Sequence, residues 1–421
     1  MGDTRGKLDR IGILRPLTIR DFAFLWTGTS VSMVGDGIYV VAIAWQVYQL
    51  SNTPTALAAV GIAWWLPQLF LLLGSGVLSD RMDRRHLMIV GDVVRFFAIG
   101  TVGVLSLAGA LTIPRLIGLA VVYGIGQAIF GPAFSSIVPS IVPPDLLVEA
   151  NSLGQFVRPF AMTLVGPFVG GLLVGGLGLG WAFLADGLSF GFSALMILLM
   201  RTRPAERDPE DRTSLWSDTK EGVRYVRRNT WLWAAMVGAF VSLLCTWGPW
   251  ETLVPFIVKN ALHGSAIDLG LVFGAGGVGA VLAAGIMGQR AALPRRAITF
   301  LYLAWAFGML MTTFFGVVTA VWQAMIVAFF AEGAITLLVV VWITLMQQLV
   351  PSELLGRVSS LDWMISTGGV PLSFAIVGPL AGVIGARATL VWAGLLGAGV
   401  TIAFLFIPGA RGPERDGTLV R

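Results

Sequence analysis

The stretch Gly76-Val-Leu-Ser-Asp-Arg-Met-Asp-Arg-Arg85 lies between two long apolar segments, and it decides how the rest of the chain is interpreted. Aspartate and arginine are almost never fully buried in a soluble core unless they are paired. The flanking segments are each long enough to cross a bilayer as a helix. We therefore interpret this stretch as a short cytoplasmic turn between two transmembrane helices.

The composition agrees with a membrane protein. The 421 residues are 56% hydrophobic and only 12% charged, whereas a soluble domain carries about 25% charged residues. The net charge of +5 does not indicate nucleic-acid binding, because the basic residues lie in the gaps between apolar segments. The single cysteine excludes an intramolecular disulfide. The two histidines have no metal-ligand spacing, so we expect neither a metal nor a cofactor.

Twelve apolar segments are long enough to span a bilayer. Those of the first half are predicted at 22–48, 54–78, 87–110, 114–138, 153–175 and 180–200. Those of the second half are predicted at 232–258, 268–289, 297–316, 320–346, 364–384 and 388–408. Most lysines and arginines fall in gaps that lie on one side if both termini are cytoplasmic, as the positive-inside rule requires. The polar N-terminus lacks the apolar core of a cleavable signal peptide.

Two sequence repeats indicate that the two halves are related. Residues 141–153 resemble residues 349–361, and residues 165–170 resemble residues 377–382 in the same order. We therefore expect an all-α membrane protein with two pseudo-symmetric six-helix bundles and a substrate site at the midplane. The predicted parts are an N-terminal cytoplasmic segment (1–21), the first bundle (22–200), a cytoplasmic linker (201–230), the second bundle (231–408) and a cytoplasmic tail (409–421).

The linker is the longest polar segment of the chain. Its second part, Ser214 to Arg228, is predicted to form an amphipathic helix on the membrane surface.

With these features assembled, the chain resembles the major facilitator superfamily over nearly its whole length. The loop after the second span is similar to a motif of that superfamily, at the positions Gly76, Asp80, Arg81, Arg84 and Arg85. Asp83 stands where the superfamily usually has glycine, which resembles the macrolide-efflux and siderophore-exporter branch of drug:proton antiporters.

A second resemblance lies in the fifth span, which is similar to a motif associated with antiporters. It is carried by Gly166, Pro167, Gly170 and Gly171, although Met162 replaces its leading glycine. The fourth span departs from the superfamily, because Tyr123-Gly-Ile-Gly-Gln127 lacks the usual arginine.

The resemblance implies that Asp80 is part of a conformational latch. In the superfamily such an aspartate faces the start of the eleventh span, where a helix dipole favours an anion. The contact breaks when the halves rock. The alternative is that the arginines of this loop only fix the topology.

Several charged residues fall inside predicted spans, where each costs about 2.5–3.5 kcal/mol on insertion scales. The candidates for proton coupling are Asp36, Glu332, Glu251 and Asp186. A buried carboxylate takes up a proton more readily than one in water. A carboxylate that opens alternately to each side can therefore carry a proton. The alternative for each is a structural ion pair or hydrogen bond.

Three further charged residues are structural candidates. Asp92 and Arg95 are three apart and share one face of a helix, and Arg158 is a candidate partner for one of the acids. The candidates for a substrate cavity are Trp250, Gln46, Gln127, Gln323 and Trp342. Trp250 beside Glu251 would offer a ring and a carboxylate to an amphipathic cation, although packing or lipid contact explains the tryptophans equally.

These features predict a secondary transporter and no enzyme. No phosphate-binding loop of an ATP-driven pump is present, because Gly6-Lys7 is followed by Leu8. The predicted function is proton-coupled export of amphipathic small molecules, such as drugs, macrolide-like natural products or siderophores. The alternatives are a proton-coupled importer and a non-transporting binding or sensing protein. We expect a monomer in the bacterial inner membrane, whose partners are protons, a small-molecule substrate and lipid, with no nucleic acid.

Overall fold

A computed structural model describes residues 12–81, 83–201, 215–289 and 293–416. Within these ranges the side chains of 12, 13, 72–81, 144, 148, 152, 155, 156, 215–219 and 352 are not described. The described residues are helical and contain no strand. Twelve helical segments are long and apolar enough to cross a membrane, which confirms the predicted all-α fold with twelve spans.

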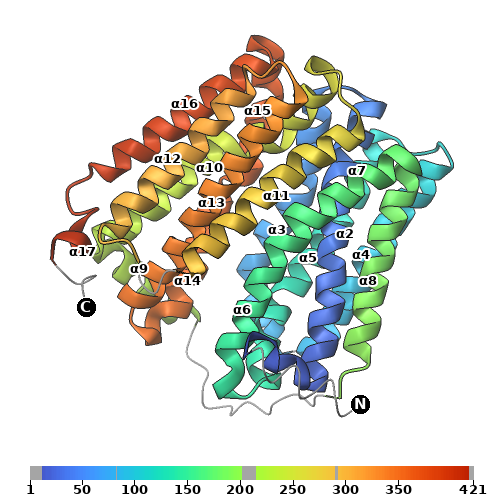
Figure 1. Cartoon of the computed structure of the whole chain (residues 1–421). Helices are drawn as coiled ribbons and strands as arrows, with labels where there is room; N and C mark the ends of the chain where they lie inside the picture. The colour runs from blue at the N-terminus through green and yellow to red at the C-terminus, as the bar shows by residue number, and fades with distance from the viewer. Residues whose placement is uncertain (1–11, 82, 202–214, 290–292, 417–421) are drawn as a thin grey trace. The chain divides into compact units, whose positions relative to one another are not determined.

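The first six spans come from eight helical segments between residues 20 and 198 (Figure 1). They are α2 (Arg20–Leu50), α3 (Pro54–Arg81), α4 (Arg84–Leu107), α5 (Ile113–Ile141), α6 (Leu147–Arg158), the π-helical segment η3 (Pro159–Val165), α7 (Gly166–Gly176) and α8 (Leu179–Leu198). Short 3₁₀ helices, η1 (Gly12–Thr18) and η2 (Pro144–Leu146), precede α2 and α6.

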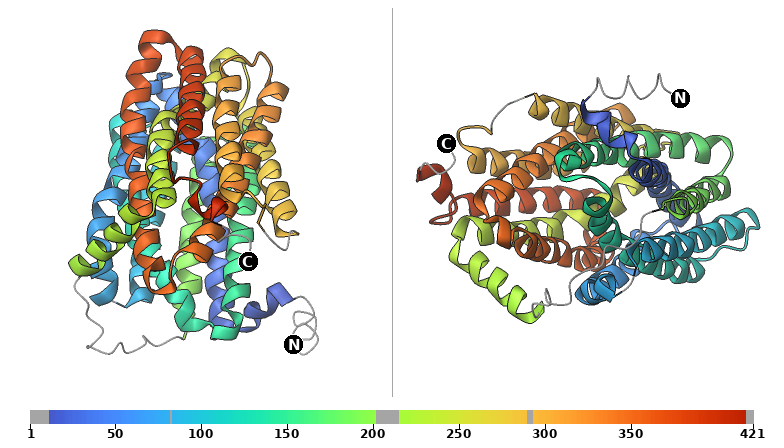
Figure 2. Two further views of the ribbon diagram at one scale, coloured as in Figure 1. Left: turned by 90° about the vertical axis from the view of Figure 1, so that its left-hand side faces the viewer. Right: turned by 90° about the horizontal axis from the view of Figure 1, so that it is seen from below.

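The later spans follow the helix α9 (Leu215–Arg228). They are built from α10 (Thr230–Phe256), η5 (Ile257–Ala261), α11 (Ala266–Gly288), α12 (Ala297–Phe315), α13 (Val321–Leu349), α14 (Ser352–Gly368), α15 (Val370–Ile384) and α16 (Ala386–Leu405). A short helix, α17 (Gly412–Arg415), lies near the C-terminus. In Figure 2 the rainbow colours show that successive long helices run back and forth.

The chain forms two compact units. The first, called unit 1 below, comprises residues 1–52, 59–206 and 264–274, and unit 2 comprises the remaining residues. In unit 1, α4 packs between α5 and α8, and α2 packs against α8. In unit 2, α12 packs against α13 and α16, and α10 packs against α15 and α16.

The repeated sequences adopt the same local structure in both halves. Val142 directly follows α5 and Val350 directly follows α13, each in an extended conformation (φ −113° and −93°) because a proline follows. The turns before α8 and α16 also correspond, since each contains a glycine with positive φ, at Gly178 (96°) and Gly385 (85°). The internal similarity is therefore structural as well as sequential.

Candidate functional site

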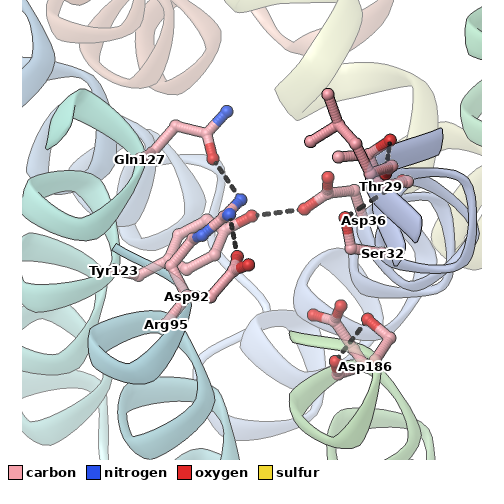
Figure 3. A network of polar contacts seen from close by, with 10 residues as sticks. Thr29, Ser32, Asp36, Asp92, Arg95, Tyr123, Gln127 and Asp186 are labelled. Atoms are coloured by element: carbon pink, nitrogen blue, oxygen red, sulfur yellow. Dashed lines mark hydrogen bonds and ion pairs between the residues drawn. The ribbon is translucent and has the colours of Figure 1, made fainter. Parts of the chain in front are cut away.

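A cluster of polar side chains lies inside unit 1, where four spans meet (Figure 3). Its members are Asp36 of α2, Asp92 and Arg95 of α4, Tyr123 and Gln127 of α5, and Asp186 of α8. All six residues come from segments long and apolar enough to span a membrane. Folding therefore brings together charges that are up to 150 residues apart in the sequence.

Arg95 is the centre of this cluster. It forms an ion pair with Asp92 and donates a hydrogen bond from Nη1 to Oε1 of Gln127 at 2.8 Å. The guanidinium carbon lies 4.2 Å from the ring centre of Phe130 and 4.4 Å from that of Phe190. The charge is thus enclosed by a carboxylate, an amide and two aromatic rings, which stabilise a cation away from water.

Asp36 joins the cluster through a tyrosine. The hydroxyl of Tyr123 donates a hydrogen bond to Oδ1 of Asp36 at 2.7 Å. Tyr123 is itself buried, whereas Asp36 keeps partial exposure. Since one hydrogen bond satisfies only part of a carboxylate's accepting capacity, Asp36 retains accepting capacity for a proton or a ligand.

Asp186 is the most isolated member of the cluster. It is fully buried, and neither carboxylate oxygen has a hydrogen-bond partner among the described residues. Gly35, which precedes Asp36, leaves space for the carboxylate of Asp186. A Cβ atom at position 35 would lie only 2.5 Å from Oδ1 of Asp186, so a larger residue would clash with it. A buried ionised carboxylate without partners costs several kcal/mol, and the protonated form avoids this cost.

The charges of the cluster do not balance. The cluster contains three carboxylates, those of Asp36, Asp92 and Asp186, and one enclosed guanidinium, which pairs with Asp92. Two negative charges would remain if every group were ionised. In a medium of low dielectric constant, protons or a bound cation must neutralise such an excess. The arrangement is therefore chemically able to exchange protons or to attract cations.

Arg158, the third predicted pairing residue, lies at the end of α6 and is exposed. It forms no ion pair with a described residue. Asp92 and Arg95 form the expected ion pair, which lies in the same cluster as Asp36.

Unit 2 contains two further intramembrane acids, Glu251 of α10 and Glu332 of α13. Both are partly exposed, and the charge of Glu332 acts on Glu251. No described residue donates a hydrogen bond to either carboxylate. Gly276 of α11 makes room for Glu332, because a Cβ there would lie 2.8 Å from Cγ of the glutamate.

In the loop between α3 and α4, the side chains of Asp83, Arg84 and Arg85 form hydrogen bonds with helix ends and backbone carbonyls. Asp83 accepts a hydrogen bond from the backbone of Arg85 and caps α4. Arg84 donates to the carbonyl of Ser136 (2.7 Å), and Arg85 donates to the carbonyls of Ile197 and Leu198 at the end of α8 (3.0 and 2.7 Å). Positive charge is favourable there because of the helix dipole.

The other residues of the predicted latch, Gly76, Asp80 and Arg81, lie outside the side chains that the structure describes. The latch therefore stays a prediction.

The antiporter-like motif forms a line of close contact between α7 and α2. A Cβ on Gly166 would lie 2.6 Å from Cα of Gly37, and one on Gly170 would lie 2.9 Å from Cα of Ile38. Gly166 starts α7 directly after the π-helical segment, with Pro167 as its second residue, and Gly171 follows Gly170 on the same helix. Small residues thus bring the two helix backbones together, right beside Asp36.

The predicted cavity residues have varied surroundings. Gln127 binds Arg95, Gln46 is buried and accepts a hydrogen bond from Ser106 at 2.6 Å, and Gln323 caps the start of α13. Trp342 donates to Asp362 at 2.9 Å, and Trp250 packs edge-on against Phe315 at 5.1 Å. These contacts give each residue a structural role, and a role in binding substrate stays a prediction.

Sequence reasoning missed Tyr123 as the partner of Asp36. It also missed that Arg95 occupies the cluster with Asp36. The only signal was that Tyr123 and Gln127 are polar groups four residues apart in an apolar span, and therefore on one helix face.

Comparisons with known proteins agree with this fold. The model of a family described as transmembrane secretion effector matches residues 11–415. The multidrug efflux pump Tap of Mycolicibacterium fortuitum is 27% identical over 94% of this chain and 96% of its own. Macrolide efflux protein A of Streptococcus pyogenes is 22% identical over 59% of this chain and 62% of its own.

Two solved transporter structures show the same fold. A mutant of the nucleoside transporter NupG has a TM-score of 0.68 at 9% identity, covering 93% of this chain and 98% of its own. A bacterial homologue of the human lysosomal transporter Spinster has a TM-score of 0.67 at 14% identity, covering 95% of this chain and 97% of its own. The chain therefore belongs to the transmembrane secretion effector family, in the efflux branch of the major facilitator superfamily.

Proposed function

We propose that this protein is a proton-coupled antiporter that exports amphipathic small molecules, such as drugs, macrolide-like natural products or siderophores. It would work by alternating access in the bacterial inner membrane, as a monomer with both termini in the cytoplasm. The observation that carries the proposal is the charge imbalance in unit 1, where three carboxylates share one enclosed arginine.

In this proposal Asp36 exchanges the proton. It is partly exposed and holds one hydrogen bond from Tyr123, so protonation changes its bonding without disturbing the Arg95–Asp92 pair. Asp186, Glu251 and Glu332 are the further candidates, since each lacks a described partner for its carboxylate. A proton bound from one side biases the equilibrium between inward- and outward-open states, which couples the gradient to transport.

Export is favoured over import because of the relatives. The names of Tap and of macrolide efflux protein A describe efflux pumps, and the first of these aligns over nearly its whole length. A proton-coupled importer is the second candidate within the transporter class. A non-transporting binding protein is the third, and it would keep its function when the proton gradient is collapsed.

The test is uptake of a fluorescent amphipathic cation into inverted membrane vesicles that carry an imposed, acid-inside proton gradient. We expect uptake that stops when an uncoupler is added and that is absent from vesicles containing the Asp36→Asn variant at equal protein level. Asp268→Asn is the matched control, because Asp268 caps the start of α11 through Ser265 at the surface and belongs to no cluster.

Uncoupler-insensitive uptake would refute proton coupling. Uptake that depends on the gradient but is unchanged in Asp36→Asn would remove Asp36 from the mechanism. Gradient-driven movement only in the opposite direction would identify an importer.

A further inference from the structure

The helix α9 directly precedes the span formed by α10, and one of its faces is docked within unit 2. Gly222 lets α9 approach α14, because a Cβ there would lie 3.1 Å from Cδ1 of Leu361. Val226 joins the apolar core of the unit, and the hydroxyl of Tyr225 donates to the carbonyl of Leu349 at 3.1 Å. Gly222, Tyr225 and Val226, on the side of the helix that an amphipathic segment would insert into lipid, therefore contact protein.

The opposite face of α9 is a basic stripe, made of Lys220, Arg224, Arg227 and Arg228. The spacing of three and four residues places them on one side of an α-helix. All four side chains are exposed, and none forms an ion pair or hydrogen bond with a described residue. Glu221, the neighbouring acid, is paired with Arg357 and does not neutralise the stripe.

The position of the stripe points to the membrane surface. Arg228 ends α9, and the membrane span of α10 begins at Thr230. The basic residues thus lie within three helical turns of the start of this span. Clusters of lysine and arginine immediately next to a span are attracted to anionic lipids, since the cytoplasmic leaflet carries a negative surface potential.

We propose that the basic stripe of α9 binds the phosphate headgroups of anionic phospholipids in the adjoining leaflet. The complementarity is one of charge: four unpaired cations on a helix that α14 holds in a fixed orientation face a surface of phosphate anions. The binding is electrostatic and needs no insertion of side chains between acyl chains. It goes beyond the transport activity proposed above and does not depend on it.

Two properties follow from the physical nature of the contact. The affinity for an anionic lipid falls by about fivefold for each charge removed from the stripe, and by about a hundredfold for three. It also weakens as salt is raised, because the Debye length shrinks from about 10 Å at 0.1 M to about 3 Å at 1 M. A zwitterionic lipid shows neither dependence.

The test uses the full-length protein, purified in a non-ionic detergent and titrated with phosphatidylglycerol or phosphatidylcholine while bound lipids are counted by native mass spectrometry. The variant is R224Q/R227Q/R228Q. The matched control is R295Q/R296Q/R415Q, which removes three arginines of unit 2 that are equally exposed but lie outside the stripe.

We expect the first variant to lose phosphatidylglycerol affinity by about a hundredfold at 0.1 M salt, with phosphatidylcholine binding unchanged. The control variant removes the same number of charges from two separate segments, Arg295–Arg296 before α12 and Arg415 of α17, and is expected to lose clearly less affinity than the stripe variant. Equal loss in both variants, or affinity that persists in 1 M salt, would overturn the proposal. Preferential capture of acidic protein or nucleic acid by the stripe, with unchanged lipid binding, would also overturn it.

Single variants keep the test informative if the triple variant does not fold. R224Q and R227Q lie in the middle and last turn of α9, and each is expected to weaken phosphatidylglycerol binding by about fivefold. A graded loss across R224Q, R227Q and R224Q/R227Q supports a shared electrostatic surface. No loss in any of them contradicts it.

Discussion

The two units hold their intramembrane acids in opposite ways. In unit 1, Asp92 is paired with Arg95, and Asp36 is bonded to Tyr123, so most of the charge is fixed in a packed network. In unit 2, Glu251 and Glu332 are partly exposed and have no described hydrogen-bond donor, and no described arginine or lysine acts on them. A carboxylate thus belongs to a packed cluster in unit 1 and is a partly exposed group without a hydrogen-bond donor in unit 2.

This difference separates two consequences of substitution. Removing a member of a packed ionic network leaves a buried charge without its partner, which destabilises the fold. Removing a carboxylate that has no hydrogen-bond donor breaks no contact within the protein. The effect is then expected on the binding of protons or substrate and not on stability. The two units are therefore expected to respond differently in stability and in transport.

The largest effect is expected for Asp36→Asn. Asparagine still accepts the hydrogen bond from Tyr123 but cannot release or take up a proton at neutral pH. We expect gradient-driven transport to fall by about a hundredfold or more, within the range that loss of an essential proton-transfer group produces. Membrane insertion and thermal stability should be unchanged. Transport measured in reconstituted vesicles decides this, and near-normal rates would place the coupling proton elsewhere.

The next effect concerns stability in unit 1. Arg95→Met preserves much of the volume but leaves Asp92 buried without its counter-ion, which costs about 3–5 kcal/mol. We expect a marked drop in the thermal unfolding midpoint of the detergent-purified protein. The double variant Asp92→Asn/Arg95→Met should recover part of the loss, because the orphaned charge is gone. A double variant no more stable than Arg95→Met would argue against the ion pair as the cause.

Unit 2 should give the reverse pattern. Glu332→Gln and Glu251→Gln remove charge without breaking a described contact, so stability should change by no more than about 0.5 kcal/mol. Transport of a cationic substrate should fall by roughly tenfold, which corresponds to about 1.4 kcal/mol of lost interaction. Vesicle uptake measures the expected loss of transport, and the thermal unfolding midpoint measures the expected lack of change in stability. A strongly destabilised glutamine variant would show that these acids are structural.

The smallest effect on transport is expected for a substitution outside the spans, at Glu414. Glu414 of α17 accepts hydrogen bonds from the backbone nitrogen and the hydroxyl of Thr299, at 2.6 and 2.8 Å, and so caps the first turn of α12. Glu414→Gln should weaken this contact by about 1 kcal/mol and leave transport intact. Faster hydrogen exchange at the amide of Thr299 is the expected signal. Loss of transport in this variant would mean that the C-terminal segment influences the cycle.

In the two interrupted spans the helix begins before the predicted span. The fifth span was predicted to begin at 153, but its helix starts at Leu147, turns π-helical at Pro159 and continues as α7. The eleventh was predicted to begin at 364, whereas α14 starts at Ser352. In both, the first turns contain polar residues, so their hydropathy is low, while packing against the rest of the unit still makes them helical.

The helix α9 shows what the sequence predicted and what only the structure revealed. The sequence predicted an amphipathic helix over 214–228, and the structure has a helix at Leu215–Arg228. The periodicity alone suggested that its apolar side lies on lipid. Part of that side instead contacts α14, because Gly222 permits a close approach to Leu361.

The sequence by itself determined the membrane class, the twelve spans, the related halves and the list of intramembrane charges, because the cost of polar groups in lipid acts on each segment independently of its neighbours. Only the tertiary structure decided which of these charges meet. Asp36, Arg95 and Tyr123 lie on three different helices, and no local pattern encodes how α2, α4 and α5 are rotated against one another. That rotation follows from packing, including the glycine contacts of Gly37 and Gly166, which act only once the helices are assembled.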